Sequence, residues 1–146
     1  MPPILLWFCE VCAETWSLTK QDTRKLTVFE NNCLRAILGV RLQDRVSLKK
    51  LRKKAKLEIP IEYVIKKRRL SWFGHVSRMS DDSLVKRCMK EEFVGTRKRG
   101  RPEKRWQDII REDTGLPLAT AERYAQDRLR WRQKVNKWAK PPAEVW

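Results

Sequence analysis

The sequence predicts a mostly α-helical protein, with about five to six helices in a small bundle and one exposed basic loop that contains glycine and proline. Apolar residues recur at spacings of three and four along most of the chain, which is the spacing of one helix face. No stretch of useful length alternates with a period of two, except among the first dozen residues. A chain of 146 residues suits one domain or a piece of a larger protein, and 41% hydrophobic residues suffice for a core.

The chain divides into an apolar N-terminal segment (1–18), a basic helical region (19–92), a basic loop (93–104) and a C-terminal helical region (105–140). The apolar run at 4–12 is a strand or the buried end of a larger body, and its pattern does not decide between them. Thr19 and Asp22 have the spacing of a capping box, and Gly39 is placed to end the first helix. The predicted apolar face of this helix consists of Leu26, Phe29, Cys33 and Ile37.

Two more helices follow in the basic region. Residues 44–56 form a short second helix with Ser47 as its N-cap and a buried edge of Leu48, Leu51 and Ala55. Pro60 occupies the favoured first position of the third helix. The apolar side of that helix holds Ile61, Ile65, Trp72 and Val76. Its four consecutive cations cannot all point outward, so at least one must lie at the edge of the apolar stripe: Lys66, Lys67, Arg68 and Arg69.

Three helices complete the prediction. Residues 80–82 cap a short fourth helix that carries Leu84, Val85, Cys88 and Met89. A fifth helix contains Trp106, Ile109 and Ile110 and ends near Gly115. The last helix is the best patterned, and we expect it to be continuous through Ala121, Tyr124, Arg128, Trp131, Val135 and Trp138.

The charge of the chain predicts a polyanionic partner. Lys and Arg outnumber Asp and Glu by 34 to 18, which gives a formal net charge of +16. Residues 41–111 hold 23 of these cations against 9 acids, whereas the flanks are nearly neutral. A merely solvated charged face would mix the two signs more evenly. We therefore expect RNA and/or DNA as the partner, and no membrane or small-molecule substrate.

The basic loop carries the sequence Arg99-Gly100-Arg101-Pro102, which resembles the core of an AT-hook. Glycine lets the backbone lie close to the floor of a narrow groove, and proline stiffens the extended path. The loop either reads an A·T-rich minor groove or binds phosphates without sequence preference. The predicted contacts here are Arg97, Lys98, Arg99, Arg101, Lys104 and Arg105.

The third helix supplies the other predicted contacts. Lys66, Lys67, Arg68 and Arg69 are candidate phosphate ligands, and Trp72 and His75 are lesser candidates for base contacts. His75 is the only histidine, and no nucleophile or carboxylate pair accompanies it. Paired carboxylates, a Gly-rich phosphate loop and a Ser/His/Asp order are all lacking in the sequence, so we expect no enzymatic activity.

The cysteines do not predict a disulfide framework. Cys9 and Cys12 form half of a possible zinc site, but Cys33, His75 and Cys88 give no second close pair, so buried thiols are favoured over a metal site and no cofactor is expected. The apolar run at 4–8 lacks a basic flank and a cleavage site, and it is too short to cross a bilayer. We expect an intracellular protein, nuclear rather than cytoplasmic.

Several motifs in a fixed order resemble the C-terminal, thumb and post-thumb region of the endonuclease/reverse transcriptase polyproteins of non-LTR (LINE-type) retrotransposons. The resemblance covers residues 12–136. It is most specific at Arg68-Arg69-Leu70-Ser71-Trp72-Phe73-Gly74-His75-Val76-Ser77-Arg78-Met79. It also rests on Cys12-Ala13-Glu14-Thr15-Trp16, Cys33-Leu34-Arg35-Ala36-Ile37-Leu38-Gly39, Arg99-Gly100-Arg101-Pro102, and Ala125-Gln126-Asp127-Arg128 with Trp131-Arg132.

The resemblance implies a region that holds template RNA or target DNA beyond the polymerase palm. The paired metal-binding aspartates and the endonuclease of that family have no counterpart here, so the polymerase and nuclease activities are not carried over. Residues 1–11 depart from the family pattern, which suggests a reading frame that starts within a truncated copy. Two alternatives remain open: a translated retroelement fragment without selected function, and a domesticated AT-hook-like DNA-binding protein.

Overall fold

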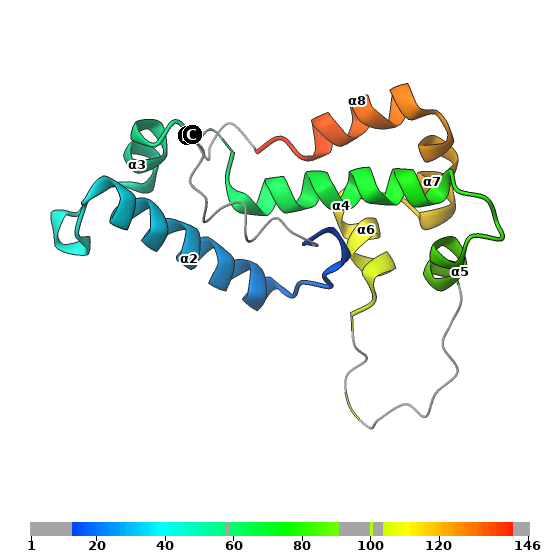
Figure 1. Ribbon diagram of the computed structural model, residues 1–146, viewed down its shortest axis with the longest axis horizontal. Helices are drawn as coiled ribbons and strands as arrows, with labels where there is room; N and C mark the ends of the chain where they lie inside the picture. The colour runs from blue at the N-terminus through cyan, green and yellow to red at the C-terminus, as the bar shows by residue number, and fades with distance from the viewer. Residues whose placement is uncertain (1–12, 58, 91–99, 101–103, 142–146) are drawn as a thin grey trace.

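The computed structural model describes residues 13–57, 59–90, 100 and 104–141. This part of the chain is mostly α-helical and contains no strand, which confirms the predicted fold class (Figure 1). The described elements are the 3-10 helices η1 (Ala13–Thr15) and η2 (Leu42–Asp44) and the α-helices α2 (Lys20–Leu38), α3 (Leu48–Lys54), α4 (Ile61–Ser77), α5 (Leu84–Lys90), α6 (Trp106–Thr114), α7 (Leu118–Gln126) and α8 (Arg128–Trp138). None of the described helices is both long enough and apolar enough to cross a membrane.

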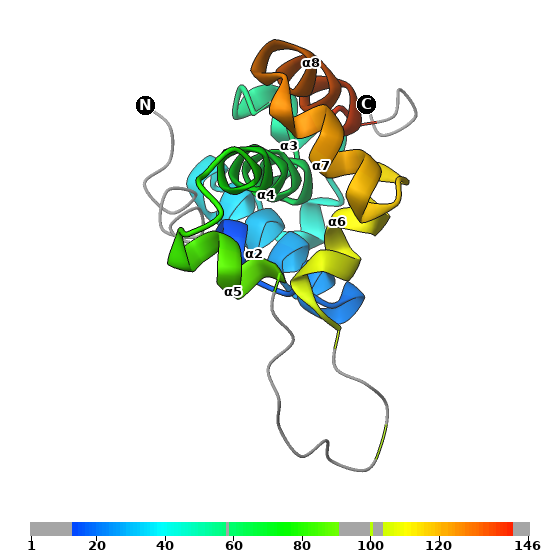
Figure 2. The same ribbon diagram turned by 90° about the vertical axis from the view of Figure 1, so that its right-hand side faces the viewer.

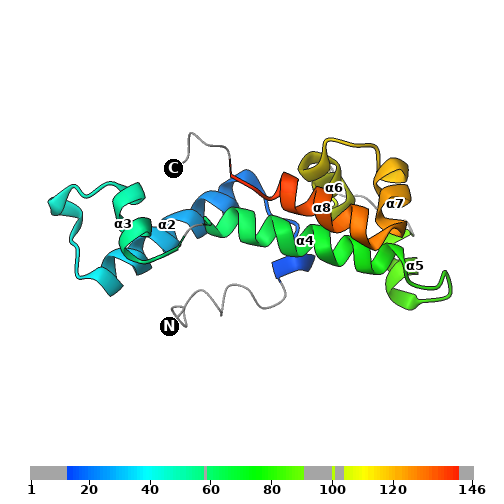
Figure 3. The same ribbon diagram turned by 90° about the horizontal axis from the view of Figure 1, so that it is seen from above.

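Helix α4 is the centre of the molecule. It contacts η1, α2, α5, α6, α7 and α8, and Figure 2 shows it nearly end-on with other helices around it. Viewed from above, α2 and α3 lie toward one end of the molecule, while α5, α6 and α7 lie together toward the other end (Figure 3). Helix α8 runs along α4 between these ends.

The sequence of α4 fits its central place, because buried residues are found on more than one side of it. The apolar set extends beyond the predicted single stripe to Leu70 and Phe73, and it includes Gly74. Trp72 is only partly buried. Pro60 precedes the helix with φ −60° and ψ 148°, so it is the N-cap and not the first helical residue as predicted.

Two apolar clusters lie along α4. The larger joins α4 to α6, α7 and α8 through Leu70, Phe73, Ile110, Ala121, Ala125, Trp131 and Val135, and Trp106 and Trp138 pack against it. The smaller joins η1 to the start of α4 through Ala13, Ile61 and Ile65, with Leu18 and Leu26 at its edge. The indole N–H of Trp106 donates to the carbonyl oxygen of Glu14 at 2.8 Å, so it ties α6 to η1.

Helix α2 begins and ends as predicted but presents a different face. The capping box forms, because the Asp22 N–H donates to the Thr19 hydroxyl and the Asp22 carboxylate accepts the Thr19 N–H; Gly39 ends the helix at φ 62°. However, the predicted apolar face is wrong at Phe29, which is 43% exposed, and at Ile37, which is 52% exposed, whereas Leu26 packs against the smaller cluster and Cys33 is half-buried. The buried residues of this helix are Glu30 and Leu34.

The buried charge of Glu30 explains this orientation of α2. One carboxylate oxygen accepts from the Arg52 guanidinium at 2.9 Å, and the other accepts from the Ile61 backbone N–H at 3.2 Å. A buried carboxylate is costly unless it is paired and hydrogen-bonded, and here both oxygens are satisfied. Glu30 therefore fixes α2 against α3 and the first turn of α4.

The C-terminal region contains two helices where the sequence predicted one continuous helix. Asp127 has φ −85° and ψ 106°, outside the helical region, and its carboxylate accepts the N–H groups of Leu129 and Arg130 at 3.0 Å. Asp127 is thus the N-cap of α8, which ends α7 within the apolar pattern. The second predicted helix is also shorter than expected: α3 begins after Ser47, whose side chain makes no capping hydrogen bond.

Candidate nucleic-acid interface

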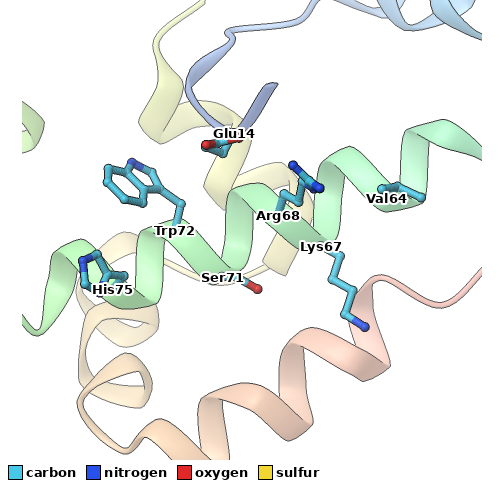
Figure 4. A pocket seen from close by; sticks show the side chains of 7 residues that line it. All are labelled: Glu14, Val64, Lys67, Arg68, Ser71, Trp72 and His75. Atoms are coloured by element: carbon cyan, nitrogen blue, oxygen red, sulfur yellow. The ribbon is translucent and has the colours of Figure 1, made fainter. Parts of the chain in front are cut away.

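The outer face of α4 carries a line of three polar residues at helical spacing, Lys67, Ser71 and His75. Residues four apart on a helix lie on one face, one above the other. The three line two hollows, one on each side of the line, with volumes of about 550 and 440 Å³. Figure 4 shows the larger one, with Lys67 and Ser71 pointing down toward α8 and Trp72 and Arg68 pointing up toward Glu14.

The smaller hollow lies between α4 and α8, and we call it the cationic groove. Its lining includes Lys67 and Arg78 from α4 and its C-cap, Arg128 and Arg132 from α8, and the indole of Trp131. Ser71, His75, Val135 and Asn136 complete it, and none of these lining residues is acidic. Among the described residues, none of the four cations forms an ion pair. Positive charge is therefore concentrated in a concave surface, which raises the local concentration of anions.

The geometry of the cationic groove depends on a close approach between α8 and α4. The indole N–H of the buried Trp131 donates to the carbonyl oxygen of Leu70 at 2.9 Å, in the middle of α4. A Cβ atom on Gly74 would overlap the five-membered ring of this indole. Glycine at this position thus lets Trp131 lie against the α4 backbone and holds Arg128 and Arg132 beside Lys67.

Arg78 closes the end of the cationic groove. Its guanidinium donates to the carbonyl oxygen of Ala125 at 2.6 Å, which links the end of α4 to α7. Partial burial, together with the positive charge of Arg128, lowers the pKa of Arg78. An arginine stays protonated at neutral pH despite such a shift. The two like charges therefore destabilise each other, and a bound anion would relieve that repulsion.

The larger hollow, which we call the Trp72 hollow, has a different chemistry. Its lining consists of Glu14, Val64, Lys67, Arg68, Ser71, Trp72 and His75, and its surface is mostly apolar. The rings of Trp72 and His75 have centroids 5.4 Å apart and planes inclined by 34°. Glu14 is the only acid among the residues that line the two hollows.

The structure brings together four of the predicted contact residues, Lys67, Arg68, Trp72 and His75, around the Trp72 hollow. Lys66 and Arg69 lie apart from it, on the side of α4 that faces α6. Arg69 is only 6% exposed and pairs with Asp113 at 2.9 Å, and Lys66 lies 3.8 Å from the same carboxylate. Arg69 as a phosphate contact is therefore wrong, because it is buried and its charge is already neutralised. It is the inward-facing cation that the helical spacing required.

Of the predicted contacts of the basic loop, only Lys104 and Arg105 belong to the described residues. Arg97, Lys98, Arg99 and Arg101 lie outside the described residues. Gly100 is described, and its φ of 132° is a conformation that other residues rarely adopt. Lys104 pairs with Glu112 at 2.5 Å, and the N–H of the exposed Arg105 donates to Asp108 at the start of α6. Neither of these two cations lines the hollows.

Arg78, Arg128 and Arg132 were not among the predicted contact residues. The signal that was present is the spacing of four between Arg128 and Arg132, with Trp131 beside them. That spacing puts both arginines on one face of a helix. It does not say that this face lies against α4, because the contact depends on Gly74, far earlier in the chain.

No group of three or more His, Cys, Asp or Glu side chains within the described part of the chain is arranged to hold a metal ion. Cys33 is half-buried and Cys88 is exposed, so the expectation of a buried thiol is wrong for Cys88. Helix α5, which carries Cys88, has no buried residue. Cys9 and Cys12 lie outside the described residues.

Comparisons of the chain with family models, curated proteins and solved structures give no match. The resemblance to the retrotransposon reverse transcriptases therefore stays a prediction. The chemistry of the two hollows is the basis for a functional proposal.

Proposed function

We propose that this protein is a non-catalytic nucleic-acid-binding module, which holds RNA or DNA by its phosphates in the cationic groove between α4 and α8. The observation that carries the proposal is the convergence of Lys67, Arg78, Arg128 and Arg132 on one concave surface without an acid in its lining. Arginine and lysine are the side chains that bind phosphate oxygens, and arginine can do so through two parallel hydrogen bonds.

The ion pairs of several other cations support the choice of this surface. Arg52, Arg69, Lys86, Lys104 and Arg111 each lie within ion-pair distance of a carboxylate. Their charge is largely neutralised within the protein, whereas no described carboxylate pairs with the four cations of the groove. A phosphate backbone is the polyanion that supplies regularly spaced negative charges to such a surface.

The sequence resemblance suggests a biological setting for the proposal. A module of this kind in a retroelement protein would hold template RNA or target DNA for a polymerase. The present chain would bind the strand and catalyse no reaction itself.

Substitution of groove arginines, with a matched control on the same helix, tests the proposal. Arg128→Gln/Arg132→Gln removes two groove cations, whereas Arg130→Gln removes an exposed cation of α8 that does not line the groove. Glutamine is nearly as good a helix former as arginine, so α8 should persist. We expect the double variant to bind a mixed-sequence RNA or DNA at least about tenfold more weakly. The affinity of the control should stay within about twofold of wild type, because Arg130 does not line the groove and its exposed charge is screened by salt.

Two results would overturn the proposal. One is the lack of binding by the wild-type chain to any RNA or DNA at low salt. The other is an equal loss in Arg130→Gln and in the double variant, which would indicate that only net charge matters.

A further inference from the structure

The two hollows beside Lys67, Ser71 and His75 are suited to different parts of a nucleotide. The cationic groove has four cations and no acid in its lining, so it suits a phosphate. The Trp72 hollow is mostly apolar, and the carboxylate of Glu14 in its lining repels a phosphate and so offsets the attraction of Lys67 and Arg68. An uncharged base is not repelled in this way, and its N–H groups can donate to a carboxylate.

We infer that the Trp72 hollow takes an unpaired nucleobase stacked on the indole of Trp72, and that the protein therefore binds single-stranded nucleic acid in preference to a duplex. The inference rests on the proposed function, because the same strand must be held by the cationic groove. It specifies that the nucleic acid is single-stranded, and it assigns the base contact to Trp72.

The setting of Trp72 fits a stacking platform. The side chain is partly exposed in the middle of α4, and the imidazole of His75 lies against one side of it, with ring centroids 5.4 Å apart. A ring held in this way loses little conformational freedom when a base stacks on it. Every base has a π face, so such stacking tolerates any sequence.

The size and position of the Trp72 hollow also fit one base of a strand. Its volume of about 550 Å³ falls within the range of small-molecule sites. Lys67, Ser71 and His75 line both hollows, so the base and the phosphates of one strand would lie on opposite sides of these three residues. In a duplex each base is stacked between its neighbours, and the indole could reach a base face only if that base left the stack.

The decisive experiment compares single strands and a duplex across two tryptophan variants of the full chain. Trp72→Leu removes the platform, and Trp16→Leu is the matched control, because Trp16 is 39% exposed and lines neither hollow. Fluorescence anisotropy gives the affinities for labelled single-stranded RNA, single-stranded DNA and duplex DNA. Each strand is about 12 nucleotides long, which is within the range of known single-strand site sizes. We expect Trp72→Leu to weaken both single strands by about 5- to 100-fold and the duplex by less than about twofold. The RNA and DNA arms establish whether the sugar matters.

A second measurement uses the unaltered protein, so it does not depend on the folding of a variant. A single strand that carries 5-iodouracil, irradiated in complex with the wild-type chain, should cross-link to Trp72, as mass spectrometry of the peptides would show. Cross-links at other residues only would overturn the inference, as would equal losses of single-strand and duplex affinity in Trp72→Leu. If the affinity responds to Arg128→Gln/Arg132→Gln but not to Trp72→Leu, this inference fails and the proposed function stands. If the wild-type chain binds no nucleic acid, the proposed function itself fails.

Discussion

Gly74 is the residue on which the position of α8 depends most directly. The absence of a side chain there lets the Trp131 indole lie against α4 and donate to Leu70. The same contact brings the two arginines of α8 to the cationic groove. One backbone position thus links the packing of the core to the shape of the proposed binding surface.

Gly74→Ala should destabilise the protein and weaken nucleic-acid binding together. The added methyl group overlaps the Trp131 ring, and overpacking of this kind costs about 1–3 kcal/mol, which exceeds the gain of up to about 1 kcal/mol from the higher helix propensity of alanine. Ser71→Ala, at an exposed position one turn away, is the control for stability and should change the free energy of unfolding by less than about 0.5 kcal/mol. Urea denaturation followed by circular dichroism measures both variants. Equal stability of Gly74→Ala and wild type would show that α8 does not pack as closely as described.

The roles of individual cations were only partly predictable from the sequence. The four consecutive cations of α4 required that at least one turn inward, and Arg69 is that residue. Which of them it would be depends on the place of Asp113 on α6, a partner 44 positions away. Local spacing contains no information about such a partner, so Arg69 could not be separated from Lys67 and Arg68 beforehand.

At the scale of elements, the junction between α7 and α8 determines where the groove arginines lie. Asp127 ends one helix and caps the next, and Arg128 is the first residue of α8. A change in this cap should therefore affect both stability and binding.

Asp127→Ala should cost about 1 kcal/mol of stability, because two N–H groups at the start of α8 lose their acceptor. Binding should weaken as well, since the first turn of α8 carries Arg128. Asp127→Asn is the matched control: asparagine is an equally good N-cap, so it should retain most of the stability. Thermal unfolding and anisotropy titrations measure the two effects. If Asp127→Ala and Asp127→Asn were equally stable, the capping role would be wrong.

Helix ends were more predictable than helix faces. Thr19, Asp22 and Gly39 mark the ends of α2 through local chemistry that sequence analysis detects directly. The face that α2 buries is set by Glu30, because its carboxylate meets Arg52 and the N–H of Ile61 from two other elements. The spacing of the apolar residues therefore predicted that a helix forms, but not which of its faces is buried. The break at Asp127 was missed for a similar reason, since the apolar period continues across it.

At the scale of the whole molecule, the cations that form the groove do not all come from the most basic part of the sequence. The sequence concentrates its net positive charge in residues 41–111 and leaves the flanks nearly neutral. The fold places Arg128 and Arg132, from a near-neutral flank, beside Lys67 of the basic region. Several cations of the basic region are meanwhile neutralised by ion pairs, such as Arg52 with Glu30 and Arg69 with Asp113. The mostly helical class was predictable from periodicity, whereas the groove required the packing of α8 on α4.

The most direct test of the central claim is the salt dependence of nucleic-acid affinity for the wild-type chain and for Arg128→Gln/Arg132→Gln. If about six phosphates are engaged, log affinity should fall with log salt concentration with a slope of about −5. Loss of two phosphate contacts should make the slope shallower by about 2, whereas Arg130→Gln should leave it unchanged. A wild-type affinity that does not depend on salt, or a double variant with the wild-type slope, would contradict phosphate binding in the groove between α4 and α8.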